Sequence, residues 1–360
     1  MHVKNLQLKN FRNYKKLNID FSDGVNIFIG DNAQGKTNIL ESIYYCSLGK
    51  SNRTNNDKEL IRWDSSEAFI MLDVSKERLD KKVEIKIFKE GKKGIKINSI
   101  KINKISELVG AFNVVMFSPE DLKIVKDSPS FRRNFLDIEL CKLNVKYYYN
   151  LVQYNKVLNE KNLVLRSWAI KNMDILDVYD EQLSDFSYYI IKERKKYIQK
   201  LNEYGKIVHK RITSQVEEIN FEYITSVKDT KADTIDLLRK NRQRDILKKY
   251  SSIGPHKDDV LITINGINVR SFGSQGQQRT SVLTIKFASI DIIKDITNEF
   301  PVLLLDDVLS ELDFKRQKFI LSSINGIQTV ITCTGMDRIK ECIEKDTKIF
   351  TVKNGEVELS

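Results

Sequence analysis

The chain has little proline, histidine or cysteine, and it has no long apolar run. Only 4 prolines, 3 histidines and 4 cysteines occur among its 360 residues. No apolar stretch approaches the roughly 20 residues that a membrane-spanning helix needs, and the N-terminal residues lack the apolar core of a secretion signal. These absences argue against a membrane protein and predict a cytoplasmic location.

The cysteines are scattered along the chain. Cys46, Cys141, Cys333 and Cys342 form no C-x-x-C pair, and none has a neighbouring histidine. A thiolate metal site or a disulfide framework normally requires such spacing. We therefore expect reduced, mostly buried thiols.

Acidic residues are fewer than basic residues. Lys and Arg number 60 against 49 Asp and Glu, which gives a net charge of +11 and a pI near 9.2. Such an excess favours a polyanionic partner, but AT-rich genomes also encode lysine-rich proteins, so the charge alone leaves both explanations open. With 41% hydrophobic residues the chain is typical of a soluble protein with about two compact units.

A glycine-rich loop between a predicted strand and a predicted helix organises the rest of the chain. Its residues are Gly30, Asp31, Asn32, Ala33, Gln34, Gly35, Lys36 and Thr37. The apolar run 25–29 precedes the loop, and apolar residues at helical spacing follow it. In such a loop the backbone N–H groups surround an anion, the lysine reaches the β- and γ-phosphates, and the hydroxyl group holds Mg²⁺. The predicted ligand is a nucleoside triphosphate, ATP, with Mg²⁺.

The last third of the chain supplies two partners for this loop. The apolar run 301–305 ends in Asp306 and Asp307, as in a Walker B strand, where the first acid holds Mg²⁺ and the second orients an attacking water. Upstream, Ser274, Gly276 and Gln277 precede a predicted helix and resemble the signature motif of ABC-type ATPases. In that superfamily the signature of one subunit caps the γ-phosphate bound by the other.

The periodicity predicts two lobes. Residues 1–125 and 255–360 alternate between strands and helices and form an ATP-binding lobe, whereas residues 126–254 are mainly helical and form an inserted lobe. Proline is absent from 130–254, which favours long helices. The predicted fold is an α/β ABC-type P-loop ATPase head, with a mixed sheet, an antiparallel β subdomain and an inserted α-helical lobe. The helical region is too short for a long coiled coil.

Four basic features have two interpretations each. The β-rich piece carries nine lysines, which either contact a phosphate backbone or protect a sheet edge from aggregation: Lys81, Lys82, Lys86, Lys89, Lys92, Lys93, Lys96, Lys101 and Lys104. The clusters 132–133 and 192–196 either contact DNA or form solvated helix faces. Near the start, Arg12 either pins a nucleotide base or belongs to a strand-end turn.

Seven stretches together resemble the RecF family of bacterial recombination proteins, whose heads are similar to those of SMC and Rad50. They are residues 10–14, 30–37, 117–122, 132–137, 254–259, 274–279 and 304–313. The resemblance implies a protein that binds ATP, forms a head-to-tail homodimer with it, and associates with single-stranded, gapped or junction DNA. It also implies action with RecR and RecO to promote RecA loading, in DNA replication, repair and SOS induction.

The resemblance assigns roles to individual residues. Lys36 and Thr37 become phosphate and Mg²⁺ ligands, Asp306 the Walker B acid and Asp307 the base position. Ser274, Gly276 and Gln277 act across the dimer, while Arg12 and Asn13 lie near the nucleotide.

Transporter-type ATPases carry a glutamate at the position of Asp307 and a histidine at the end of the next strand, where this chain has Thr332, Cys333 and Thr334. Both departures predict slow hydrolysis, suited to a molecular switch and not to a metabolic enzyme. The main alternative, the ATPase subunit of an ABC transporter, would have the histidine and a smaller helical segment. A P-loop kinase would not need the signature, and a Rad50-type protein would need a coiled-coil arm.

Overall fold

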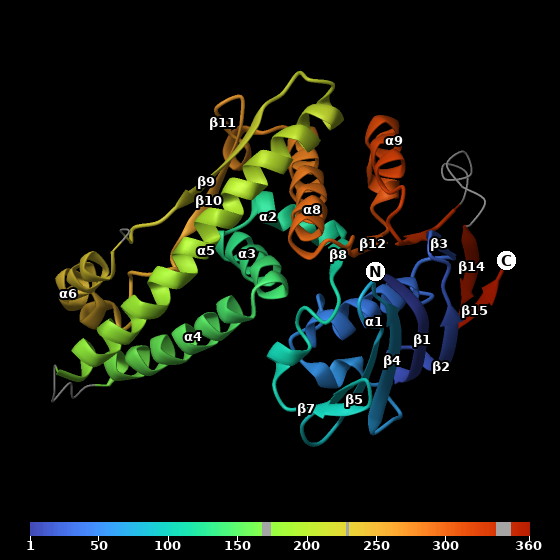
Figure 1. The fold of residues 1–360 in the computed structure, drawn as a ribbon, viewed down its shortest axis with the longest axis horizontal. Coiled ribbons are helices and arrows are strands. Elements are labelled where there is room, and N and C mark those ends of the chain that lie inside the picture. Colours follow the sequence, from blue (N-terminus) through green and yellow to red (C-terminus); the bar gives the residue numbers. More distant parts are fainter. Residues whose placement is uncertain (168–173, 228–229, 336–346) are drawn as a thin grey trace. The chain divides into compact units, whose positions relative to one another are not determined.

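The computed structural model describes residues 1–167, 174–227, 230–335 and 347–360 (Figure 1). The chain divides into two compact units, unit 1 with residues 1–121 and 286–360 and unit 2 with residues 122–285. Unit 2 includes residues beyond 255 because the hairpin that follows this residue pairs with a strand of the same unit. No helix among the described residues is both long and apolar enough to cross a membrane.

Unit 1 contains an antiparallel six-stranded sheet. Its strands lie in the order β2 (Tyr14–Asp20), β1 (His2–Phe11), β4 (Glu67–Ser75), β5 (Lys81–Phe88), β6 (Gly94–Ile97) and β7 (Ile100–Ile102). Alternate residues face a common core, as Ile70 and Leu72 of β4 do, and their neighbours face outward. The alternation seen in the sequence thus produces a sheet with one covered face.

The second sheet of unit 1 carries the nucleotide motifs. Its order is β15 (Glu356–Leu359), β14 (Lys348–Lys353), β3 (Val25–Ile29), β13 (Thr329–Cys333), β12 (Val302–Asp306) and β8 (Val114–Phe117). All neighbours except β14 and β15 run parallel, so the carboxyl ends of β3, β13 and β12 meet at one edge. Helix α1 (Lys36–Leu48) contacts strands of both sheets and ends at Gly49, which adopts a left-handed conformation (φ 66°). Helix α9 (Phe314–Ser323) follows β12.

Unit 2 is mainly helical, as its lack of proline predicts. Its helices are α2 (Lys123–Lys126), α3 (Pro129–Leu143), α4 (Val145–Arg166), α5 (Asp174–Thr213), α6 (Lys231–Lys248), α7 (Val269–Phe272) and the first part of α8 (Gln275–Thr297). The 40-residue α5 packs along α4 and α6. It is the longest of the described helices, and no long coiled coil is seen in the part of the chain that the structure describes.

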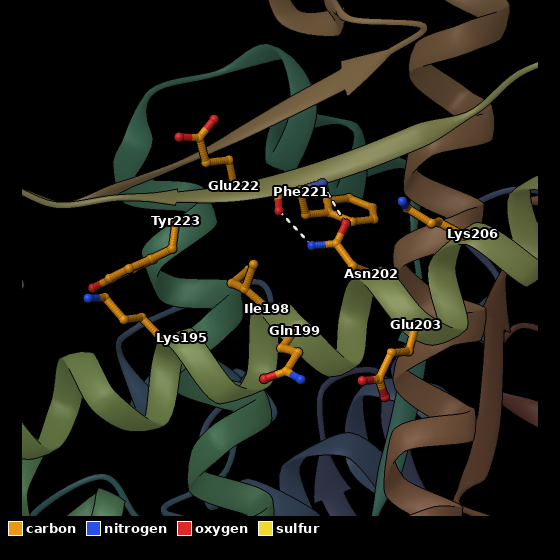
Figure 2. Close-up of a pocket in the computed structure, with 9 residues that line it drawn as sticks. All are labelled: Lys195, Ile198, Gln199, Asn202, Glu203, Lys206, Phe221, Glu222 and Tyr223. Atoms are coloured by element: carbon orange, nitrogen blue, oxygen red, sulfur yellow. Dashed lines mark hydrogen bonds between the residues drawn. The ribbon is translucent and has the colours of Figure 1, made fainter.

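A small sheet in unit 2 includes one strand that was not predicted. β9 (Ile219–Ile224) pairs antiparallel with β10 (Asp259–Ile264), which turns at Asn265 and Gly266 into β11 (Ile267–Asn268). The free edge of β9 is covered by Asn202 of α5, whose side-chain amide donates to the Phe221 carbonyl oxygen (2.7 Å) and accepts from the Phe221 N–H (2.8 Å) (Figure 2). This side chain replaces a neighbouring strand at that point.

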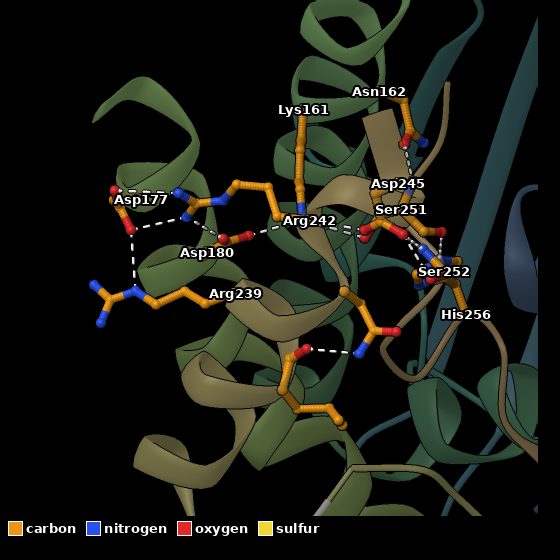
Figure 3. Close-up of polar contacts among 12 residues, drawn as sticks. Lys161, Asn162, Asp177, Asp180, Arg239, Arg242, Asp245, Ser251, Ser252 and His256 are labelled. Atoms are coloured by element: carbon orange, nitrogen blue, oxygen red, sulfur yellow. Dashed lines mark hydrogen bonds and ion pairs between the residues drawn. The ribbon is translucent and has the colours of Figure 1, made fainter. Parts of the chain in front are cut away.

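A buried ionic network joins three helices of unit 2 (Figure 3). Lys161 of α4 lies 2.7 Å from Asp180 of α5 and 3.8 Å from Asp245 of α6, and all three side chains are almost fully buried. Arg242 of α6 also pairs with Asp180 (2.9 Å). Because breaking a buried pair leaves an uncompensated charge, the network favours one packing of these helices.

Two arginines of the basic clusters are buried, so neither DNA contact nor a solvated face describes them. Arg132 is 3% exposed and forms a bidentate pair with Asp259 (2.6 and 3.0 Å). Arg194 is 2% exposed and donates to Tyr147, Asp137 and the Pro255 carbonyl oxygen. Both predictions for these two residues were wrong because their acceptors come from distant parts of the chain.

The cysteines that the structure describes match the expectation. Cys46, Cys141 and Cys333 are free and buried, and burial raises the pKa of the Cys333 thiol to about 11. Cys342 lies outside the described residues.

Candidate nucleotide-binding site

The glycine-rich loop joins β3 to α1 at the edge of the mixed sheet. Gly35 has a φ of 115°, and a Cβ atom there would lie 2.4 Å from Nδ2 of Asn13. A Cβ atom on Gly30 would lie 2.2 Å from the carbonyl oxygen of Val352. Only glycine permits both the backbone conformation at position 35 and these close approaches.

Lys36 is held inside this loop. Its ammonium group donates to the carbonyl oxygens of Gly30 (2.6 Å) and Asp31 (2.8 Å), and the residue is 7% exposed. The first turn of α1 has no acidic residue, so the positive end of the helix and the lysine act together. This arrangement is suited to binding phosphate groups.

The acid at the end of β12 faces the start of α1. Oδ1 of Asp306 accepts hydrogen bonds from the hydroxyl groups of Thr37 (2.8 Å) and Thr332 (3.0 Å). Burial raises the pKa of Asp306, and the two hydroxyl donors oppose that rise. Two side-chain oxygens, one from the first turn of α1 and one from the end of β12, are therefore adjacent, and oxygen is the ligand that Mg²⁺ prefers.

Asp307 and Thr332 complete the end of the sheet. Asp307 adopts a left-handed backbone conformation (φ 54°), and its N–H donates to the Thr332 hydroxyl oxygen (3.0 Å). Ser310 donates to the Asp307 carbonyl oxygen (2.7 Å). In the sequence, Thr332 is notable only as a residue near the position where transporter-type ATPases carry a histidine. The structure shows that this hydroxyl group links both acidic positions.

The segment after β1 supports the loop from outside. Nδ2 of Asn13 donates to the Gln34 carbonyl oxygen (2.9 Å), and Oδ1 of Asn13 accepts from Asn38 (2.8 Å). The Tyr14 hydroxyl donates to the Gly35 carbonyl oxygen (3.1 Å). Asn13 thus contacts the loop backbone and the side chain of Asn38. A position of Asn13 near the nucleotide stays a prediction.

Arg12 has a buried protein partner. Its guanidinium donates to both carboxylate oxygens of Glu41 (2.9 and 2.7 Å), which is fully buried in α1, and to the Glu59 carbonyl oxygen (3.0 Å). Arg53 lies 3.7 Å from the same carboxylate and donates to Asn38 (3.0 Å). No local sequence motif includes Glu41 or Arg53, so neither residue was predicted. A role of Arg12 in binding the nucleotide stays a prediction.

The signature residues begin α8 in unit 2. The Ser274 N–H donates to Oε1 of Gln277 (2.9 Å), and the Gln277 N–H donates to the Ser274 hydroxyl oxygen (3.2 Å), which is a capping box. Gln277 also donates to Glu217 (2.8 Å). Ser274 is exposed and Gly276 is half-buried at this helix N-terminus.

Known proteins are similar to this chain over almost its whole length. The model of the RecF/RecN/SMC N-terminal domain family matches residues 2–358. The chain is 62% identical to the DNA replication and repair protein RecF of Clostridium novyi (strain NT) over 360 residues, which is 99% of each chain. The chain belongs to the RecF family. RecF of Clostridium tetani (strain Massachusetts / E88) is also 62% identical, over 99% of each chain.

Solved structures of RecF confirm the predicted fold class. The recombination mediator RecF of the RecFOR pathway, solved with ATPrS, has a TM-score of 0.93 and 35% identity, and the match covers 99% of this chain and 98% of that chain. The same mediator with ATP has a TM-score of 0.92 and 35% identity, and the match covers 100% of this chain and 97% of that chain. An Smc head bound to part of ScpA shares only the fold. Its TM-score is 0.59 and its identity is 15%, and the match covers 100% of this chain and 97% of that chain.

Proposed function

We propose that this RecF-family protein is an ATP-dependent DNA-binding factor of recombinational repair. The observation that carries the proposal is the 2.8 Å hydrogen bond between Thr37 and Asp306, which joins the P-loop to the Walker B strand. Solved RecF relatives that contain ATP or ATPrS support ATP as the ligand. The name of the Clostridium novyi relative supports a role in DNA replication and repair.

The loop residues divide the work of binding ATP. The backbone N–H groups of 30–37 and the ammonium group of Lys36 hold the phosphates. Thr37 and Asp306 are the residues that would hold Mg²⁺, and their adjacent oxygens fit that ion. Bound Mg²⁺ would neutralise charge on the phosphate oxygens. Asp307 orients the attacking water, while Thr332 keeps both carboxylate-bearing residues in position.

The signature acts on a second copy of the chain. Ser274, Gly276 and Gln277 at the N-terminus of α8 cap the γ-phosphate bound by the partner's P-loop, so two ATP molecules hold a head-to-tail dimer. Hydrolysis removes the γ-phosphate and opens the dimer. We expect weak ATPase activity used as a molecular switch, because the base position carries the shorter Asp307 and Thr332 replaces the histidine.

The dimer acts on DNA with protein partners. We propose single-stranded, gapped or junction DNA as the substrate, and RecR and RecO as partners that promote RecA loading during replication, repair and the SOS response. The RecFOR pathway named for the solved relatives supports this set of partners. A cytoplasmic location follows from the same role. The alternative, an ABC transporter ATPase subunit, is disfavoured by the long helices of unit 2 and by Thr332.

Light scattering with labelled gapped DNA tests the proposal. ATP with Mg²⁺ should double the mass and tighten DNA binding. Lys36→Met should abolish both effects, and Ser274→Arg should keep ATP binding but block the dimer. Lys240→Met, at an exposed lysine of α6, is the matched control and should behave as wild type. A Ser274→Arg protein that still dimerises with ATP would contradict the capping role.

A further inference from the structure

The antiparallel sheet of unit 1 has an outward face that the ATP site does not use. The strands alternate, so that Ile70 and Leu72 of β4 are buried in the core whereas Phe69 and Met71 are partly exposed. On β5 the exposed Lys86 follows the buried Ile85 in the same way. One face of the sheet is therefore open among the described residues, and its composition can be determined from the strand register.

The register aligns three lysines and one phenylalanine across four strands. Lys16 of β2 lies opposite Lys9 of β1, Lys9 lies opposite Phe69 of β4, and Phe69 lies opposite Lys86 of β5. At a strand spacing of about 4.8 Å this row is about 14 Å long. We call these four residues the basic row.

Further cations and a second aromatic side chain extend the face. On one side of the basic row, Lys96 of β6 lies opposite Lys101 of β7. On the other side, the partly exposed Phe88 of β5 lies two residues beyond Lys86, on the same face of the strand. In the strand register, the carboxylates beside the row on β5 and β4 are Glu84, opposite Lys96, and Glu67, opposite Phe88. The basic row itself contains no acid.

The lysines of the basic row have no protein partner among the described residues. Lys9, Lys16 and Lys86 are exposed and form no ion pair there. Other lysines on the same sheet differ, since Lys4 pairs with Asp80 (3.4 Å). Unneutralised lysines are available to an anionic partner.

Protection of a sheet edge does not explain this row. Lysines on edge strands discourage pairing with another chain, and this accounts for Lys101 on β7 and Lys16 on β2. Lys9 and Lys86, however, are on β1 and β5, which both have neighbours on each side. A partly exposed Phe69 on the central strand between them has no protective role.

We propose that the basic row binds a single-stranded nucleic acid segment, with Lys9, Lys16 and Lys86 on the phosphates and Phe69 against a base. Lysines interleaved with aromatic rings on an open sheet are the combination by which proteins hold single strands without reading their sequence. This inference rests on the proposed DNA-binding function and specifies where the strand lies.

Fluorescence anisotropy with labelled oligothymidylate and a blunt duplex of equal length tests the inference in ATP and Mg²⁺ across a salt series. Lys9→Ala/Lys86→Ala should weaken single-strand binding at least tenfold. It should also lower the slope of log affinity against log salt by about 1.4, since each phosphate contact contributes about 0.7 for single strands. Phe69→Ala should weaken single-strand binding about tenfold with an unchanged slope and leave duplex binding as it was.

Controls separate the local effect from general ones. Lys240→Ala/Lys353→Ala removes the same charge from exposed positions outside the row and should bind as wild type. If Phe69→Ala fails to fold, Phe69→Leu removes the aromatic ring while keeping an apolar side chain. ATP binding and Tm should be unchanged in every variant that is scored.

The outcomes distinguish this inference from the proposed function. If wild type binds oligothymidylate and the row variants match the control pair, the basic row is not the binding surface, while the proposed function stands. If the lysine pair weakens single-strand binding but Phe69→Ala does not, no base stacks on Phe69. The inference that the row binds a single strand is then wrong. If wild type ignores all DNA with ATP present, the proposed function fails and takes the inference with it.

Discussion

The hydroxyl group of Thr37 lies 2.8 Å from Oδ1 of Asp306, although 269 positions separate the two residues in the sequence. The parallel order β3, β13, β12 produces this proximity, since the residues that follow parallel strands emerge at the same edge. Asp306 is 7% exposed, and its described partners there are hydroxyl groups. A buried carboxylate whose hydrogen-bond partners are neutral destabilises a fold unless a cation is bound.

Asp306→Asn should therefore stabilise the protein without nucleotide while abolishing ATP-driven dimerisation. The amide oxygen can still accept from Thr37 and Thr332, whereas the buried charge is removed. We expect the free energy of unfolding to rise by about 1 kcal/mol near neutral pH. Urea unfolding measures it, with Asp64→Asn, whose side chain is 73% exposed, as the unaffected control.

The pH dependence of that gain has a definite sign. The pKa of Asp306 is raised in the folded protein, so the folded state holds the proton more tightly than the unfolded state. The charged carboxylate destabilises the fold fully when the pH is above the raised pKa. This destabilisation disappears as the pH falls from the raised pKa to the ordinary carboxyl value of 3.8. The difference between Asp306→Asn and wild type should narrow in acid. A difference that widens would contradict the burial of this charge.

Thr332→Val should slow ATP hydrolysis while leaving ATP affinity close to wild type. The substitution keeps the shape of the side chain but removes the oxygen that accepts the Asp307 N–H and the hydroxyl that donates to Asp306. Because a partly buried N–H loses its acceptor and the buried Asp306 loses a donor, stability should fall by about 1–3 kcal/mol. Single-turnover hydrolysis and urea unfolding give the two readings. Thr332→Ser retains the hydroxyl group and should recover most of the activity.

The Arg12 and Glu41 pair should be strongly coupled. Glu41 is fully buried, and Arg12 contributes two of its hydrogen bonds. Glu41→Gln and Arg12→Gln should each destabilise unit 1, and a double-mutant cycle should give a coupling energy of about 1–3 kcal/mol. The surface pair Arg62 and Asp64 is the matched control, and its cycle should give less than about 1 kcal/mol. Equal coupling in the two cycles would show that burial contributes nothing here.

The sequence predicted those parts of the site whose signal is local. The glycine-rich loop, the strand ending in Asp306 and the cap at Ser274 are separate motifs. Each is formed by residues that are close together in the sequence, and its chemistry depends on that spacing. Thr332 and Glu41 could not be found in this way, because their roles come from strand order and from the turn after β1. Strand β9 was not predicted for the same reason, because its short alternation of buried and exposed residues resembles the end of a helix.

Burial of charged side chains was the least predictable property. Arg132 and Arg194 have the same local sequence character as solvated helix residues, although both are internal. Their acceptors include Asp259 and the Pro255 carbonyl oxygen, which lie far along the chain. The stretch 254–259 that contributed to the family resemblance is thus a structural centre of unit 2. It places acceptors for both arginines next to His256.

His256 should make the stability of unit 2 sensitive to acid. Burial lowers its pKa to about 4, with nearby Lys257, Arg133 and Lys161 acting in the same direction. Nε2 lies 2.9 Å from the Ser251 carbonyl oxygen and Nδ1 lies 2.5 Å from the Tyr154 hydroxyl, so the neutral ring donates through Nε2 and accepts through Nδ1.

The sign of the His256 effect is opposite to that of Asp306. The unfolded chain binds the proton near the ordinary histidine pKa of 6.5, so stability is complete above that value and is lost as the pH falls toward about 4. Between pH of about 7.5 and about 4.5, wild type should lose roughly 2–3 kcal/mol more than His256→Gln, at about 1.4 kcal/mol per pKa unit. Urea unfolding at the two pH values measures both losses. His256→Gln lowers stability at every pH by removing contacts, so only the difference between the losses is diagnostic. If wild type and His256→Gln lose the same stability between the two pH values, folding does not lower the pKa of His256.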